Sequence, residues 1–129
     1  MSNKKDDWNK IKYFTEKEFL CKCGECERDT GVNFILVKIL DRIREDMKFA
    51  MRITSGFRCI KHPQARGGQS SHARGFAVDV ACNSSGHRFK LLEYVLKRGI
   101  FSRIGVAYDF LHFDIDDSED KTSRVIWTY

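Results

Sequence analysis

The chain has 129 residues, of which 23 are lysine or arginine and 18 are aspartate or glutamate, so its formal net charge is +5. This length fits one domain, residues 1–129, which can bury a core without disulfide bonds and leaves no room for a second domain. No window approaches the run of about 20 apolar residues that a membrane-spanning helix needs. Residues 1–7 lack the apolar stretch of a signal peptide. We therefore expect a protein that is made in the cytoplasm and has no membrane span.

The charge pattern restricts the expected partners. The basic residues are spread along the chain instead of forming one basic helix, and no aromatic RNA-binding signature is present. A moderate positive charge favours anionic partners such as cell-wall polymers, but it also serves ordinary solubility. We expect no nucleic-acid partner, and we expect a monomer.

Helical patterns dominate the first half of the chain. Residues 1–12 are polar and are expected to form a flexible N-terminal segment. Thr15 and Glu18 have the spacing of a capping box, which predicts a short helix at this point. Apolar residues then recur at steps of three and four through residues 33–48, which predicts an amphipathic helix that Asn33 can cap.

Strand patterns dominate the second half. Residues 57–71 contain Pro63 and a glycine pair and are expected to form an irregular loop. A helix capped by Ser84 or Ser85 is expected over residues 86–98. The expected strands cover residues 50–54, 76–81, 104–107, 110–115 and 124–129. Helices followed mainly by local strand pairs predict an α+β fold, in which helices pack against a small antiparallel sheet.

Three side chains in the second half have the chemistry of a metal site. His72 and Asp79 flank Gly75, which permits a sharp turn that would let them converge, and His112 follows on a later predicted strand. Asp79 lies between two valines, where an unpaired carboxylate would be costly to bury, so we expect a cation beside it. Two imidazoles and one carboxylate can hold Zn²⁺ and leave a fourth position for water. The set predicts a small zinc hydrolase, although either histidine alone would be explained by ordinary hydrogen bonding.

His112 and Asp114 are expected to project from one face of their strand, because side chains alternate along a strand. Phe113 and Ile115 then face the core. A metal would explain the polar face at His112. Asp114 would orient a metal ligand or close a salt bridge.

Three motifs carry a resemblance to a known family. Ser55–Arg58 has the form S-G-[FY]-R, Ser70–Asp79 has the form S-x-H-x-x-G-x-A-x-D, and His112 to Asp114 has the form H-x-D. In this order they resemble the M15 family of zinc peptidases, which includes D-alanyl-D-alanine carboxypeptidases, vancomycin-resistance dipeptidases and phage L-alanyl-D-glutamate endolysins. The resemblance covers about residues 35–129. It implies the fold shared by these peptidases and hedgehog domains.

The resemblance also implies site residues. It assigns zinc to His72, Asp79 and His112, and it has Arg58 polarise the scissile carbonyl or bind the substrate carboxylate. Fixed cationic donors suit developing oxyanion charge, whereas the ordinary explanation for Arg58 is a surface or salt-bridging arginine. We expect Gln69 and Ser70 to contact the substrate, unless they only shape the loop.

The general base is predicted less directly. Asp109 precedes His112 by three residues, where several relatives place an acid, and it is the expected base. His62 or His87 could substitute for it, as some relatives use a histidine. An aspartate here is also explained by a turn, where this residue type is common.

The five cysteines are an odd number, and a disulfide framework is not expected. Cys21, Cys23 and Cys26 could be three ligands of a second, structural zinc, with Cys59 or Cys82 as the fourth. The alternative is a tight loop with reduced thiols. The C-x-C-x-x-C spacing is weak evidence for redox chemistry, because no thioredoxin-like context surrounds it.

The expected function is that of a zinc metallopeptidase acting on peptidoglycan stem peptides, of the D-Ala-D-Ala carboxypeptidase or the L-Ala-D-Glu endopeptidase type. It would reach the cell wall after lysis or by another route. The alternative is a non-catalytic, zinc-containing binding module of the same fold. A cysteine-based zinc or redox module is a third possibility, which would make the cysteines essential and His72 dispensable.

Overall fold

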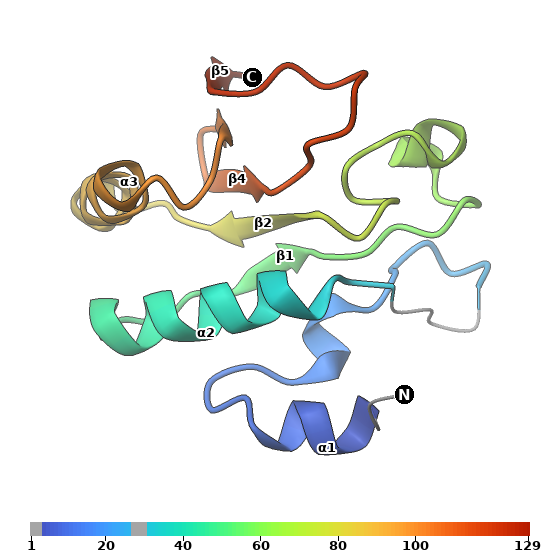
Figure 1. The fold of residues 1–129 in the computed structure, drawn as a ribbon, viewed down its shortest axis with the longest axis horizontal. Coiled ribbons are helices and arrows are strands. Elements are labelled where there is room, and N and C mark those ends of the chain that lie inside the picture. The colour runs from blue at the N-terminus through green and yellow to red at the C-terminus, as the bar shows by residue number, and fades with distance from the viewer. Residues whose placement is uncertain (1–3, 27–30) are drawn as a thin grey trace.

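The computed structural model describes residues 4–26 and 31–129. In chain order its elements are α1 (Lys4–Asn9), the 3-10 helix η1 (Glu16–Phe19), α2 (Phe34–Met47), β1 (Ile53–Ser55), the 3-10 helix η2 (Pro63–Gly68), β2 (Ala77–Ala81), α3 (Ser85–Arg98), β3 (Arg103–Val106), β4 (Phe110–Asp114) and β5 (Val125–Thr128). The architecture is α+β, as the sequence predicts, and α1 lies farthest from β5 (Figure 1). Within the described ranges, each helix is too short or too polar to cross a membrane.

The five strands form one sheet in the order β1-β2-β4-β3-β5. The pairs β1–β2, β2–β4 and β3–β4 are antiparallel, whereas β3 and β5 pair in parallel. The predicted antiparallel sheet is therefore confirmed except at this edge. The difference arises in the connection of residues 115–124, which is too long for a tight hairpin and carries the chain past β3 to its free edge.

Side-chain alternation along β2 and β4 separates the core from the opposite face of the sheet. Every second residue of these strands is apolar and fully buried: Val78, Val80, Leu111 and Phe113. The apolar stripes of α2 and α3 join the same cluster, with Leu36, Leu40, Ile43, Leu91 and Val95 among its members. Because successive side chains point to opposite faces, the intervening residues of both strands face away from this core.

The predicted starts of α2 and α3 are confirmed by the hydrogen bonds of their capping residues. The side chain of Asn33 accepts a backbone N–H from the first turn of α2 at 2.8 Å. The hydroxyl of Ser84 accepts one from the first turn of α3 at 3.3 Å. The helix predicted after Thr15 is a single 3-10 turn, and the Glu18 carboxylate accepts the Thr15 N–H at 2.8 Å.

The flexibility expected for residues 1–12 stays a prediction, but the structure has a helix in this segment. Lys4–Asn9 form α1, while the first three residues lie outside the described ranges. The physical reason is Trp8, whose ring centroid lies 5.6 Å from that of Phe19 and 5.5 Å from that of Phe34. A large aromatic side chain packed against the core stabilises a helix that is too short to form alone.

Candidate functional site

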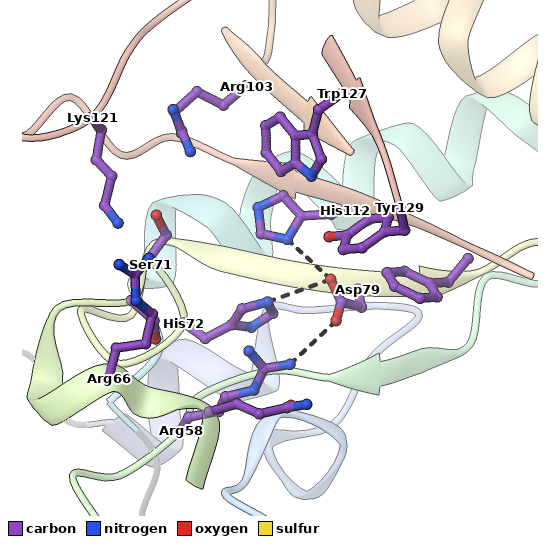
Figure 2. A pocket seen from close by; sticks show the side chains of 13 residues that line it. Arg58, Arg66, Ser71, His72, Asp79, Arg103, His112, Lys121, Trp127 and Tyr129 are labelled. Carbon is purple, nitrogen blue, oxygen red and sulfur yellow. Dashed lines mark hydrogen bonds and ion pairs between the residues drawn. The ribbon is translucent and has the colours of Figure 1, made fainter. Parts of the chain in front are cut away.

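A row of residues crosses the sheet on the face turned away from the core. Asp79 of β2 is directly opposite His112 of β4, His112 is opposite Gly105 of β3, and Gly105 is opposite Trp127 of β5. A Cβ atom on Gly105 would lie only 2.8 Å from the Trp127 ring. The absence of a side chain there lets the indole lie beside the imidazole of His112, with 5.2 Å between ring centroids (Figure 2).

His72 reaches this row from the loop between η2 and β2. Gly75 turns the chain with a φ of 81°, and a Cβ atom on it would lie 2.1 Å from the carbonyl oxygen of Gly31. Both the backbone angle and the close approach require glycine. The turn brings His72 against Asp79, with 3.4 Å between Nε2 of the imidazole and Oδ1 of the carboxylate.

Three buried side chains converge here with one potential ligand atom each, and these atoms of His72, Asp79 and His112 all lie within 4.8 Å of one another. The Nδ1–H of His72 donates to the carbonyl oxygen of Gly56 at 2.8 Å, so its Nε2 lone pair faces the cluster. His112 has Nδ1 3.0 Å from Asp79 and Nε2 2.6 Å from the carboxylate of Asp114. Each imidazole is therefore oriented by a hydrogen bond on the far side of its ring.

The charges of these groups are strongly coupled. Burial opposes ionisation of Asp79, but hydrogen bonds from His112 and His72 prevail and hold the pKa of Asp79 well below its usual value. Burial lowers the pKa of His72, and the neighbouring Asp79 only partly opposes that shift. Burial acts in the same sense on His112, but hydrogen bonds to Asp114 and Asp79 prevail and raise its pKa. An ionised carboxylate and a neutral His72 are the forms that can bind a metal.

The donor set fits a zinc ion. His72, Asp79 and His112 have only 4–7% of their surface exposed, so an ion among them would be shielded from bulk water. Their atoms provide two imidazole nitrogens and one carboxylate oxygen, the ligand types of catalytic zinc sites with an open fourth position. The outer hydrogen bonds to Gly56 and Asp114 are of the kind that orients zinc-bound histidines. The structure thus brings the predicted ligands together, and zinc binding by them remains a proposal.

The three side chains line a cavity of about 540 Å³ (Figure 2). Four cationic side chains also line it, namely Arg58, Arg66, Arg103 and Lys121. Aromatic walls are provided by Phe110, Trp127 and Tyr129. A concave surface with several cations beside apolar rings favours an anionic, partly apolar ligand.

Arg58 lies beside the Asp79 carboxylate, with 3.4 Å between Nη2 and Oδ2, and its side chain is 14% exposed. Burial lowers the pKa of Arg58, while the charge of Asp79 opposes that shift. The Nε atom of Arg58 is buried and has no hydrogen-bond partner among the described residues. A buried donor without an acceptor is costly, so an acceptor atom of a bound ligand would satisfy it.

The two other residues expected to contact substrate lie in different surroundings. Ser70 is buried and lines the cavity, and its hydroxyl oxygen accepts the backbone N–H of Ala73 at 3.0 Å. Among the described residues no acceptor is found for the hydroxyl hydrogen, which can therefore be donated to a ligand. Gln69 is exposed at the end of η2 and is not among the residues that line the cavity.

The residues considered for proton transfer lie outside the cavity lining. Asp109 is exposed on the turn between β3 and β4, and three residues along a strand span about 10 Å, which separates it from His112. The ring of His87 is exposed and stacks on Phe49, with 3.9 Å between centroids. The Nδ1 of His62 accepts a backbone N–H of η2 at 3.0 Å. This placement lends no support to the role predicted for Asp109, which stays a prediction.

The sequence reasoning did not find several residues that line the cavity. Arg103 forms an ion pair with the buried Asp114 at 3.0 Å, directly opposite it across β3 and β4. Trp127 and Tyr129 alternate along the predicted last strand, a signal that would have placed both on one face. Lys121 comes from an irregular connection, where sequence offers no comparable signal.

A second group of ligand-type side chains includes Cys59 of the loop that follows β1. Cys21, Cys23, Cys26 and Cys59 have sulfur atoms that all lie within 4.8 Å of one another. Cys82 lies apart, with its sulfur directed to a backbone carbonyl at 3.9 Å. Of the two residues considered from sequence as the fourth ligand, the structure brings Cys59 to the other three.

The family model described as Peptidase M15 matches residues 12–114 of the chain. The matched segment contains Arg58, the converging trio of His72, Asp79 and His112, and the first four strands of the sheet. It ends before β5, so the aromatic wall on that strand lies outside the match. No curated protein matches the chain.

Proposed function

The chain belongs to the M15 peptidase family, and on this premise we propose that it is a zinc metallopeptidase that hydrolyses a peptide bond in peptidoglycan stem peptides. The observation that carries the proposal is the convergence of ligand atoms from His72, Asp79 and His112 at a cavity lined by cations. The bond is either a terminal one, as in D-Ala-D-Ala carboxypeptidases, or an internal one, as in L-Ala-D-Glu endopeptidases.

In this proposal the zinc is held by three side-chain donors, namely His72 Nε2, the carboxylate of Asp79 and His112 Nδ1. When bound there, zinc supplies a Lewis acid and a water of lowered pKa. Asp114 orients the ring of His112 through a hydrogen bond to Nε2, the ring nitrogen that does not face the zinc. The carbonyl of Gly56 orients His72 in the same way through Nδ1. These outer bonds keep the donor atoms in place before a substrate arrives, which reduces reorganisation during the reaction.

Arg58 is proposed to bind the carbonyl oxygen of the scissile bond or a carboxylate of the substrate. Its unpartnered Nε provides a donor that needs an acceptor, and its contact with Asp79 holds the guanidinium at the cavity. A fixed cationic donor stabilises negative charge as it develops on an oxygen. The same donors suit a carboxylate, because the guanidinium fork matches its geometry.

The remaining cavity residues indicate an anionic substrate. Arg66 and Lys121 line the cavity, and stem peptides carry free carboxylates. Trp127 and Tyr129 offer apolar surface next to the cluster, and Figure 2 shows the Tyr129 hydroxyl directed toward it. That hydroxyl can donate a hydrogen bond to a substrate oxygen. Ser70 offers a further hydroxyl.

The test is digestion of defined stem peptides by zinc-loaded protein, with products identified by mass spectrometry. Loss of the terminal residue indicates the carboxypeptidase type, and cleavage after the first residue indicates the endopeptidase type. Zinc at this site without cleavage of any stem peptide or of purified peptidoglycan would contradict the proposal and favour a non-catalytic binding module.

A matched pair of histidine variants accompanies this test. His112→Ala should lose the zinc of this site and the turnover together, because a ligand is removed. His87→Ala changes an exposed imidazole outside the cavity and should retain the zinc. Full zinc content and full turnover in His112→Ala would show that the ligand assignment is wrong.

A further inference from the structure

Four cysteines from two distant parts of the chain lie close together. Cys21, Cys23 and Cys26 follow η1, and Cys59 follows β1 by a few residues. The sulfurs of Cys23 and Cys59 lie 3.4 Å apart, and all four sulfurs lie within 4.8 Å of one another. None of these side chains has a role in the site around His72. We propose that they form a second metal site, a structural zinc bound by four thiolates.

The spacing of the sulfurs fits a single ion. Four sulfurs placed tetrahedrally at the usual zinc–sulfur distance of 2.3 Å lie about 3.8 Å from one another. The Cys23–Cys59 separation of 3.4 Å lies near that value, and the upper limit of 4.8 Å for the other sulfur pairs allows it. An iron–sulfur cluster occupies the centre of its cysteines and holds them farther apart. All five cysteines are free thiols in this structure, and a disulfide bond is much shorter, at about 2.05 Å.

The backbone around the sulfurs is shaped as for metal ligands. Gly24 has a φ of 79°, and the tight turn it allows directs the N–H of Glu25 to the sulfur of Cys23 at 3.3 Å. The N–H of Cys59 donates to the sulfur of Cys21, also at 3.3 Å. Hydrogen bonds of this kind stabilise the negative charge of thiolates and orient them toward an ion.

The proposed ion would link the N-terminal segment to the loop that follows β1. Besides the contacts of the cysteines themselves, the exposed Lys22 donates to the carbonyl of Thr54 in β1, and the exposed Lys61 donates to the Glu25 carbonyl. Residues 20–26 form no helix or strand. A metal bound by both segments would therefore add a strong link between them, as structural zinc does in small domains.

The loop held in this way is the one that carries Arg58 and Gly56. The N–H of Phe57 donates to the carbonyl of Phe19 at 3.0 Å, and a Cβ atom on Gly56 would lie 2.7 Å from the backbone of Phe19. The loop is thus pressed against the end of η1, next to the cysteines. The proposed ion would fix it there. This inference concerns a separate group of ligands and does not rest on the proposed function.

The first experiment measures zinc per chain in protein purified under reducing conditions. Wild type should carry two zinc ions, Cys26→Ser one, and His112→Ala one. Cys82→Ser is the matched control, because it removes a buried thiol that lies outside the cluster, and it should keep two. Two ions in Cys26→Ser would overturn the thiolate site, whereas two ions in His112→Ala would overturn only the histidine site.

The second experiment leaves all four cysteines of the cluster in place. A protein with both His72→Ala and His112→Ala is freed of metal and titrated with Co²⁺ in the presence of a reductant. One equivalent should produce the strong thiolate-to-cobalt charge-transfer absorption of a four-sulfur site, and one equivalent of Zn²⁺ should abolish it. A spectrum without that absorption, or a thiol count that shows a disulfide between Cys23 and Cys59 in the native protein, would overturn the proposal.

A third measurement tests the link itself. Hydrogen–deuterium exchange should speed up in residues 20–26 and in the loop after β1 when the metal is removed from the cluster by Cys26→Ser. The same segments should exchange at the wild-type rate in Cys82→Ser. Unchanged exchange in a Cys26→Ser protein that has lost one zinc would show that the ion does not hold the two segments together.

Discussion

The Nδ1 atom of His112 and a carboxylate oxygen of Asp79 lie 3.0 Å apart, as directly opposed residues of β4 and β2. Two of the three proposed zinc ligands are therefore positioned by the hydrogen-bonded ladder of the sheet. The third, His72, is held by its bond to the Gly56 carbonyl. A site built on paired strands keeps its geometry better than one built on loops alone.

Arg58→Lys should lower kcat/KM by roughly 10²-fold, the size of effect seen when one donor to a developing oxyanion is removed. Lysine keeps the charge but lacks the planar fork of donors. Arg42→Lys is the control, because it changes an exposed arginine of α2 that does not line the cavity. Equal kcat/KM for Arg58→Lys and wild type on a stem peptide would show that Arg58 only forms a salt bridge and does not bind the substrate.

Asp114→Asn should weaken zinc affinity on the order of 10- to 100-fold, the usual effect of removing a group that orients a metal ligand. The amide carries no charge to balance Arg103 and binds the Nε2 of His112 less strongly. Competition with a chelator measures the affinity. Asp117→Asn, an exposed neighbour, is the control. Affinities that do not differ between the two variants would exclude an orienting role for Asp114.

The role predicted for Asp109 requires that Asp109→Ala keep its zinc while kcat falls by a factor of about 10² to 10⁴, the usual contribution of a general base. Both quantities are measured on the same preparation. An unchanged kcat would agree with the exposed position of the side chain on the β3–β4 turn, outside the cavity lining, and would move the role to another group.

Gly105→Ala should displace the indole of Trp127, since the new Cβ atom would lie 2.8 Å from the ring. The overlap should lower stability by about 1–3 kcal/mol and shift the tryptophan fluorescence. Thermal unfolding and emission spectra measure both effects. Gly86→Ala in α3 is the control, because the nearest atom to its Cβ would be 3.9 Å away. A Gly105→Ala protein with an unchanged spectrum and melting temperature would show that the ring has room to move.

The parts of the fold that depend on local pattern could be predicted from the sequence. α2 and α3 follow from apolar spacing and from their caps at Asn33 and Ser84, because both signals act within a few turns of helix. The parallel pairing of β5 with β3 could not be predicted, because it depends on the path that residues 115–124 take across the sheet. The helix around Trp8 was missed for a similar reason, since only tertiary packing stabilises it.

In the candidate site, too, the features set by local sequence could be predicted, and those set by tertiary structure could not. His72 and Asp79 are close in the chain and belong to a motif with a glycine between them, so their convergence could be predicted. The cavity cations Arg66 and Lys121 come from irregular segments, where the direction of a side chain depends on the whole loop. Asp109 was chosen by its spacing from His112. Sequence spacing no longer predicts which way a side chain points once the chain leaves the strand and enters a turn.

The alternation of side chains along β2 and β4 also protects the site against a register error during folding. A slip of one residue would turn Val78, Val80, Leu111 and Phe113 toward the cavity, at about 1.5–3 kcal/mol for each apolar side chain exposed. It would also force Asp79 and His112 into the apolar cluster, where unpaired polar groups are still more costly. The core thus disfavours the one-residue slips, in which the ligands would face the apolar side of the sheet. Substitutions in the apolar residues should therefore be able to abolish metal binding without touching a ligand.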